Sequence, residues 1–210
     1  KKNKLLTAAF ALFQEKGLEE TSVSDITRRA GIAKGTFYLY FRDKYALYDL
    51  LVAAQSNDVF LRAYNSMLQS EIKDDEDMIF FLINHIIDQL ADNPSLLMFI
   101  TKNLSWGLFR NALLSSDTNE YIDFEKIFSS FIYKDGVPLY KDPDLMVYMI
   151  IELIGSTCYS VILESNPVTL EELKPYLFRC IHHILAEHRI SDAPTTSTTD
   201  LSEALGLEVY

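Results

Sequence analysis

A run of basic, hydroxyl-bearing and aromatic residues near the N-terminus has the chemistry of a nucleic-acid contact. Lys34 and Lys44 can neutralise phosphates, and the hydroxyl groups of Tyr38 and Tyr40 can donate hydrogen bonds to phosphate oxygens. Thr36 is the candidate for a contact with a base edge or a thymine methyl group. These residue types at this spacing predict a surface that binds nucleic acid.

The residues just before this run predict a short helix that ends in a tight turn. Ser22 can cap the helix, with Asp25 as its reciprocal partner three residues later. Gly31 permits the left-handed conformation that ends a helix. Thr21, next to the cap, offers a further hydroxyl group to a phosphate.

A second short helix is expected to follow the turn and to carry the candidate contacts. Phe37 and Phe41 stand four residues apart and share one face, which we expect to point to the core. Tyr38 and Tyr40 then point to the nucleic acid, and Gly35 lets the helix backbone come close to the groove. Two short helices around a glycine turn are typical of a helix-turn-helix that reads DNA in the major groove.

This segment resembles a known family. Residues 26–44, Ile-Thr-Arg-Arg-Ala-Gly-Ile-Ala-Lys-Gly-Thr-Phe-Tyr-Leu-Tyr-Phe-Arg-Asp-Lys, resemble the signature of the TetR family of bacterial transcriptional regulators. Residues 5–17 are similar to that family's first helix, so the resemblance covers about the first fifty residues. Two positions depart from the commonest form: Thr27 replaces a small alanine, and Ala33 stands where Ser or Thr often caps the second helix. Loss of that cap costs about 1 kcal/mol of local helix stability.

The resemblance implies the architecture and the partners. It implies an all-α protein with an N-terminal three-helix DNA-binding head and a larger C-terminal helical domain for ligand binding and dimerisation. The last two helices would pack against their copies as a four-helix bundle. The resulting homodimer would read a palindromic operator in double-stranded DNA, with half-sites about 34–36 Å apart. A small molecule that prefers one conformation of the body would move the heads and release the operator.

The distribution of charge along the chain agrees with this expectation. The net charge is −11, yet residues 1–50 hold nine Lys and Arg against six Asp and Glu, a local charge of +3. The other 160 residues hold ten against twenty-four, a charge of −14. An acidic body is repelled by DNA, which favours docking through the head.

Beyond the head, apolar residues recur with helical rather than alternating periodicity, and we find no convincing strand pair. Helices are expected over 44–68, from the acidic run at 73–77 to about 91, and over about 95–114, 118–133, 143–164 and 170–189. The chain is therefore divided into a DNA-binding domain (1–45), a ligand-binding and dimerisation domain (46–189) and a flexible tail (190–210) rich in Ser and Thr.

A ligand pocket is expected where aromatic and polar residues mix on body helices. The candidates are Phe99, Asn103, Trp106, Phe109, Arg110, Tyr148, Glu152 and Tyr159. Aromatic residues at helical spacing equally suit an ordinary core, and this alternative stays open. As a pocket, the set favours a hydrophobic or cationic effector, with the Glu152 carboxylate as the counter-charge.

Other functions receive little support. The segment from Leu145 to Leu163 is long enough to cross a membrane, but Glu152 in its middle and acidic flanks favour a core or interface helix. Cys158 and Cys180 form no CxxC or Cys/His cluster, and no signal peptide is visible, so we expect a cytoplasmic protein without a metal or cofactor.

Two functions from different classes remain. The sequence contains no nucleophile–base pair, phosphate-binding glycine loop or HExxH motif, so we expect no enzyme activity. The first hypothesis is a homodimeric transcriptional regulator, acting as a repressor, that a small molecule releases from its operator. The alternative is a DNA-bound interaction protein that a protein partner controls.

Overall fold

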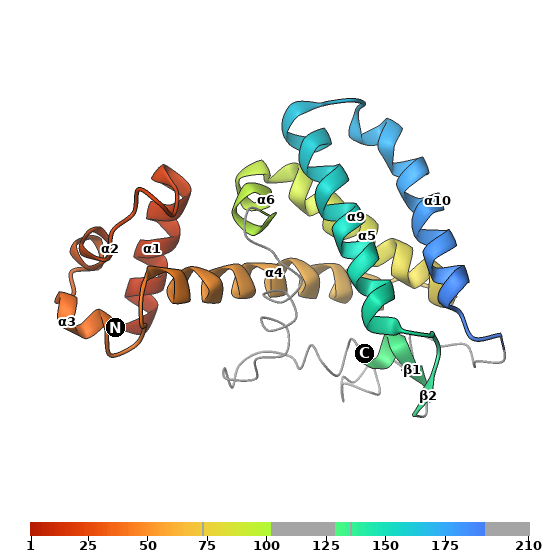
Figure 1. Cartoon of the computed structure of the whole chain (residues 1–210), viewed down its shortest axis with the longest axis horizontal. Coiled ribbons are helices and arrows are strands. Elements are labelled where there is room, and N and C mark those ends of the chain that lie inside the picture. Colours follow the sequence, from red (N-terminus) through yellow and green to blue (C-terminus); the bar gives the residue numbers. More distant parts are fainter. Residues whose placement is uncertain (73, 102–128, 135, 192–210) are drawn as a thin grey trace.

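The computed structural model describes residues 1–72, 74–101, 129–134 and 136–191, and these residues form an almost entirely helical protein (Figure 1). A small N-terminal head of three helices sits at one end of a long helix, and the other helices gather around that helix's far part. The expected fold class, an all-α protein with a helix-turn-helix head and a larger helical domain, is confirmed.

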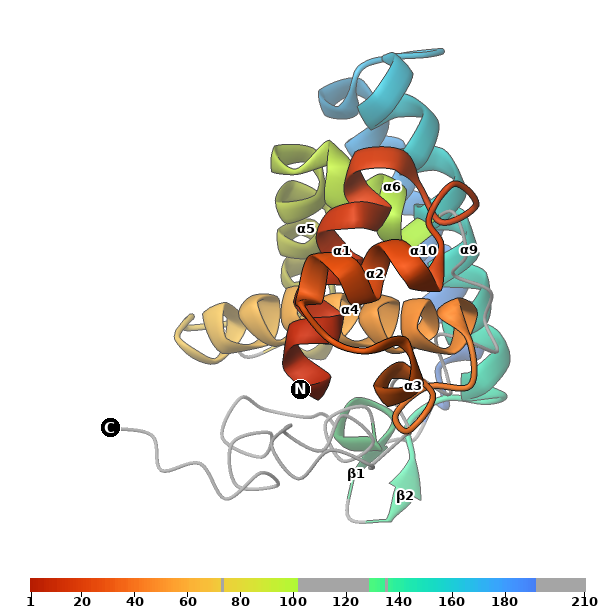
Figure 2. The same ribbon diagram turned by 90° about the vertical axis from the view of Figure 1, so that its left-hand side faces the viewer.

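The head consists of α1 (Lys2–Lys16), α2 (Val23–Ala30) and α3 (Lys34–Phe37). The predicted cap of α2 is present: the Ser22 hydroxyl accepts from the Asp25 amide, and the Asp25 carboxylate accepts from the Ser22 amide. Gly31 is left-handed, with φ 64° and ψ 38°, as expected. Figure 2, which looks onto the head, shows α1 and α2 in front of the body.

The long helix α4 (Lys44–Leu68) leaves the head and runs into the body. Its N-terminus is capped by Asp43, whose carboxylate accepts a hydrogen bond from the Ala46 amide at 2.8 Å. The helix has the bounds that its apolar periodicity predicted. One continuous helix therefore connects the candidate DNA surface with the rest of the protein.

The body adds α5 (Asp75–Asp92), α6 (Pro94–Thr101), α9 (Pro143–Glu164) and α10 (Leu170–His188). Thr169 caps α10 in a reciprocal arrangement with Glu172. α9 packs mainly on α10 and also on α6, while α5 packs on α4. These contacts make a layer of α5, α6, α9 and α10 around the far part of α4 (Figure 1).

A small hairpin differs from the sequence expectation of no strand pair. The strands β1 (Tyr133–Lys134) and β2 (Val137–Pro138) pair antiparallel, two residues each. Such short strands leave no alternating pattern in the sequence. The chain after the hairpin is held to the end of α10 by backbone hydrogen bonds, among them Ile190 N–H to Leu139 O at 3.1 Å.

The buried core runs without a break from the head into the body. One hydrophobic cluster joins head residues such as Leu5 and Phe37 to Tyr48 on α4 and Phe99 on α6. A second cluster lies between α5, α9 and α10, and a third between α4 and α5. Movement in the body can therefore reach the head through packed side chains.

Candidate functional site

The end of the helix-turn-helix presents aromatic side chains to solvent. Phe37 is fully buried and Phe41 is nearly so, and their rings lie 5.5 Å apart under the surface. The three residues between them are exposed, Tyr38 to 54%, Leu39 to 79% and Tyr40 to 44%. The expected division into core-facing phenylalanines and outward tyrosines is what the structure shows.

The recognition element itself is short. α3 spans Lys34–Phe37, and its N-cap, Ala33, makes no side-chain hydrogen bond. Turns follow directly, closed by Tyr40 N–H to Phe37 O at 3.0 Å and Phe41 N–H to the same oxygen at 3.0 Å. Lys34 and Gly35 are exposed and Thr36 is half-buried, so the three residues lie at the surface of the head.

Lys44 and Thr21 have structural contacts within the head. The Lys44 ammonium group donates hydrogen bonds to the Leu18 carbonyl at 2.9 Å and to the Glu19 carbonyl at 3.0 Å. One N–H of this group is thus left for a phosphate. Thr21 is 1% exposed, and its hydroxyl donates to the Gly17 carbonyl at 2.7 Å. This geometry gives Thr21 a structural role, and we leave it out of the DNA surface.

Two ion pairs join α1 and α2 within the head. The Lys16 ammonium lies 2.9 Å from the Asp25 carboxylate, and Arg29 lies 2.6 Å from Glu15. The hydrogen bond from the Ser22 hydroxyl, followed by that from Lys16, holds the pKa of Asp25 well below its usual range. The hydrogen bond from Arg29 likewise lowers the pKa of Glu15. Arg29 is therefore engaged within the head, whereas Lys34 stands out on the recognition element.

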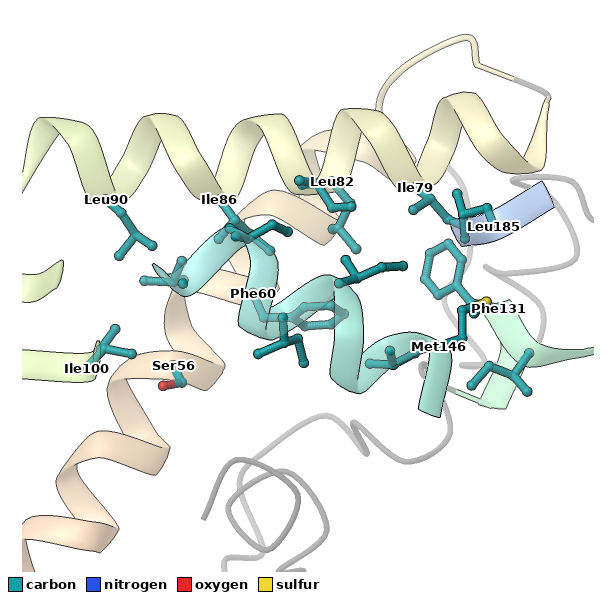
Figure 3. A pocket seen from close by; sticks show the side chains of 18 of the residues that line it. Ser56, Phe60, Ile79, Leu82, Ile86, Leu90, Ile100, Phe131, Met146 and Leu185 are labelled. Carbon is teal, nitrogen blue, oxygen red and sulfur yellow. The ribbon is translucent and has the colours of Figure 1, made fainter. Parts of the chain in front are cut away.

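A second candidate site is a cavity of about 240 Å³ in the body (Figure 3). Its wall is built from α4, α5, α6, α9 and α10, together with residues next to the hairpin. Almost every side chain in the wall is aliphatic or aromatic. The wall residues that belong to the described chain include none with a charge.

One polar group in this wall has no partner. The Ser56 side chain, on α4, belongs to a residue that is only 9% exposed, and its hydroxyl makes no hydrogen bond with the described residues. Buried hydroxyl groups are normally paired. The side chain lies at the end of the cavity that Ile100 of α6 also borders (Figure 3).

An aromatic contact joins this end of the cavity to the head. The Tyr48 hydroxyl on α4 donates a hydrogen bond to the Phe99 carbonyl at 2.8 Å. The Phe99 ring packs edge-on against Phe10 of α1, with ring centres 5.1 Å apart. Because Ile100 borders the cavity and its neighbour Phe99 touches Phe10, α6 contacts both the cavity and α1 of the head.

Comparison with known proteins identifies the family. Residues 5–51 match the family described as "Bacterial regulatory proteins, tetR family". A segment of 47 residues is 55% identical to the uncharacterized HTH-type transcriptional regulator YvdT of Bacillus subtilis strain 168, and it covers 22% of this chain and 24% of that protein. The N-terminal head, residues 5–51, therefore belongs to the TetR family. Its first three curated relatives are matched over 24%, 28% and 46% of their own lengths.

Solved structures of the TetR fold extend the likeness over most of the chain. The transcriptional regulator FadR from Bacillus subtilis, in complex with stearoyl-CoA, matches with a TM-score of 0.56 and 21% identity, over 86% of this chain and 97% of that one. Thermus thermophilus FadR, a repressor in complex with lauroyl-CoA, matches with a TM-score of 0.55 and 16% identity, over 92% and 99%. At these identities the likeness concerns the fold.

The residues expected to form the TetR ligand pocket are not the ones that line the cavity. Phe99 is buried between head and body, the Glu152 side chain is exposed, and neither borders the cavity. Tyr148, 40% exposed, and Tyr159, which packs on the head-side core, also lie off it. The remaining candidates lie outside the described residues: Asn103, Trp106, Phe109 and Arg110.

Two features of the structure were not predicted from the sequence. Leu39 is the most exposed large apolar residue of the head, and its place between two candidate tyrosines was the available signal. The cavity wall consists mostly of Ile, Leu, Val and Met residues that resemble ordinary core residues in sequence, so no pattern distinguished them.

The titratable groups of the described segments form no cluster that could hold a metal ion. Within them no group of three or more His, Cys, Asp or Glu side chains is placed to hold a metal ion. Cys158 is buried and Cys180 is exposed, and both are free thiols. Burial raises the pKa of the Cys158 thiol to about 11, so its reactive thiolate form is scarce at neutral pH.

Proposed function

We propose that this chain is a homodimeric transcriptional repressor that binds a palindromic operator and is released from it by a small molecule. The observation that carries the proposal is the capped helix-turn-helix with Tyr38 and Tyr40 exposed above buried phenylalanines. In the complex, Lys34, Gly35, Thr36, Tyr38, Tyr40 and Lys44 contact the DNA. A regulator of this kind acts in the cytoplasm, where bacterial DNA lies.

The dimer is supported by the outer surface of α9. By length and composition, this helix is apolar enough to cross a membrane. An 18-residue stretch of it has a mean hydropathy of 1.8, and 22% of that stretch is buried in the single chain. Leu145 and Tyr148 on it are largely exposed in the single chain. A second copy that packs α9 and α10 against this surface would cover it and would also bring two heads to one operator.

Release by a small molecule is supported by the position of the cavity. A ligand can shift the protein toward a conformation that it binds more tightly. α4 and α6 border the cavity and also contact the head. A ligand that moves either helix would alter the spacing of the two heads and weaken binding to a palindrome.

The test is selection of bound duplexes from a random DNA pool with the purified protein, followed by titrations of the best sequence over a range of salt concentrations. We expect a palindrome with half-sites about 34–36 Å apart. Lys34→Ala should lower affinity and reduce the salt slope by about 1 per lost phosphate contact. Lys134→Ala, on the hairpin, is the matched control and should leave both unchanged.

The outcomes separate the two functions considered. A palindrome with reduced salt slope for Lys34→Ala supports the repressor. Absence of any enriched sequence, for a protein shown to be folded and dimeric, overturns operator binding. Operator binding that no small molecule weakens, but that a captured protein does weaken, would favour control by a protein partner.

A further inference from the structure

The cavity extends along α5, whose side chains Ile79, Leu82, Ile83, Ile86 and Leu90 line it. Four of them, Ile79, Leu82, Ile86 and Leu90, recur at intervals of three or four residues and stand in a row along one face of α5, opposite α9 (Figure 3). Eleven residue steps of an α-helix from Ile79 to Leu90 span about 16 Å.

The cavity follows this row of apolar side chains and the residues of α9 that face it. This arrangement favours a linear occupant that lies along α5 and α9.

The wall chemistry agrees with the shape. Side chains along the channel, such as Ile86, Met146 and Ile150, are flexible and aliphatic and offer no hydrogen bonds. An occupant gains there from burial of apolar surface, about fourfold in affinity for each methylene group removed from water. The exposed Glu152 carboxylate does not border the channel, so no described residue in its wall would pair with a buried cation.

We propose that this channel binds one unbranched alkyl chain lengthwise and that this chain is the part of the effector that the body recognises. The statement that this ligand is the effector rests on the proposed function. The statement that the channel binds an alkyl chain does not. One end of the alkyl chain lies beside Ser56 and Ile100, the wall residues on α4 and α6, the two helices that contact the head. A charged head group, where the molecule has one, stays outside the part of the channel described above.

Gly155 provides a substitution that closes the channel. It borders the cavity on α9, and a Cβ atom built on it meets no other atom within 4 Å. Gly155→Leu adds an isobutyl group at a position that borders the channel and has space for it, and we expect this group to block the channel. Gly155→Ala adds one methyl group at the same backbone position and is the matched control.

The experiment is calorimetric titration of the full chain, without DNA, with 1-hexanol, 1-octanol and 1-decanol. Affinity should rise about fourfold per added methylene. 1-Adamantanol, which has the carbon count of decanol in a compact cage, should bind at least tenfold more weakly than decanol. Gly155→Leu should lose at least tenfold in decanol affinity, whereas Gly155→Ala should stay within about threefold of the native protein.

Three results would overturn the proposal: no dependence on chain length, adamantanol binding as tightly as decanol, or unchanged decanol binding by a folded Gly155→Leu protein. The alcohol series on the native protein decides the matter even where Gly155→Leu does not fold. Decanoic acid, decanoyl-CoA and decyltrimethylammonium then show which head group the alkyl chain carries; decyltrimethylammonium binding tenfold tighter than decanol would overturn the location of the head group.

The same ligands distinguish this inference from the proposed function. Decanol binding that lowers operator affinity supports both. Decanol binding without any change in operator affinity keeps the alkyl site and overturns its role as the effector site. Operator binding with no alkyl binding removes the channel proposal and leaves the repressor in place.

Discussion

The head and the body of this protein are stabilised in different ways. The head depends on short-range directional contacts, such as the reciprocal cap of Ser22 and Asp25 and the left-handed Gly31. The body depends on apolar contacts between residues far apart in the chain, as where Ile87 of α5, Ile150 of α9 and Leu185 of α10 share one cluster. The first kind of contact constrains residue identity strongly, and the second constrains mainly size and polarity.

The two candidate functional sites lie in these two different regions. The DNA surface is built on the part that resembles relatives at 55% identity over 47 residues. The cavity is built in the part whose likeness to solved structures is confined to the fold. Aliphatic wall residues can be exchanged without loss of the fold, so the ligand can change between relatives while the head keeps its chemistry.

The largest effect is expected from a charge placed on the apolar outer surface of α9. Tyr148→Glu would place a charge on the exposed side of α9, where the proposed dimer requires apolar contact. We expect the protein to become monomeric and operator affinity to fall by about 100-fold or more, since one head replaces two. Light scattering and DNA titration measure the two effects.

Tyr133→Glu is the control for this substitution. Tyr133 is 45% exposed and lies on β1, outside α9 and α10. It should leave mass and affinity unchanged. A dimeric Tyr148→Glu protein with native affinity would place the dimer interface elsewhere.

The contrast between the regions also explains what the sequence could predict. Ser22, Asp25 and Gly31 act on neighbours within four residues, so their roles and the bounds of α2 could be predicted from the sequence. The bounds of α4, α9 and α10 followed from apolar periodicity. The DNA surface followed from the same local pattern, except that the burial of Thr21 and the exposure of Leu39 depend on the folded head.

The cavity could not be predicted in this way. Its wall joins residues from α4 to α10, for instance Phe60 and Leu185, and their proximity depends on how the helices cross. The sequence predicted a pocket of mixed aromatic and polar residues, whereas the wall is almost entirely apolar. Whether an apolar residue borders a void or another side chain is decided by packing, which the sequence pattern does not record.

A smaller effect is expected where the two regions meet. Tyr48→Phe removes the buried hydrogen bond to the Phe99 carbonyl and keeps the ring. A lost hydrogen bond of this kind costs about 1 kcal/mol. If this contact transmits ligand binding, the ligand-induced drop in operator affinity should shrink by about fivefold.

Tyr45→Phe is the matched control, because Tyr45 is exposed and its hydroxyl lies 3.5 Å from Glu19. Operator titrations with and without decanol compare the two variants. An unchanged ligand response in Tyr48→Phe, with a lowered Tm, would assign this hydrogen bond to stability alone.

Low pH should destabilise the head more than the body. In the head, hydrogen bonds lower the pKa values of Glu15, Asp25 and Asp43, the last mainly through the Ala46 amide. A carboxyl group with a lowered pKa stabilises the folded state above its unfolded pKa, about 4, and this contribution is lost as the pH falls. Burial raises the pKa of Asp49 on α4, which acts in the opposite direction. In the body, hydrogen bonds from Thr169 lower the pKa of Glu172, so the head holds three such carboxyl groups against this one in the described part of the body.

We therefore expect the head to lose structure before the body as the pH falls from about 5 toward about 2. Amide spectra recorded through this range would show α2 signals disappearing first. Ser22→Ala, which removes the cap, should move that loss to higher pH. Simultaneous loss of head and body signals would indicate that their continuous core makes them one cooperative unit.

The smallest effect concerns which residue reads a thymine methyl group. Sequence reasoning assigned this role to Thr36, but Leu39 is the more exposed apolar side chain, at 79%. Replacing thymine by uracil at one position per half-site removes a methyl group, which should cost at most about fourfold in affinity where that methyl is buried. Leu39→Ala should abolish the difference between thymine and uracil if Leu39 covers the methyl group. Thr36→Ser should abolish it instead if Thr36 does, because that substitution deletes the threonine methyl and keeps the hydroxyl.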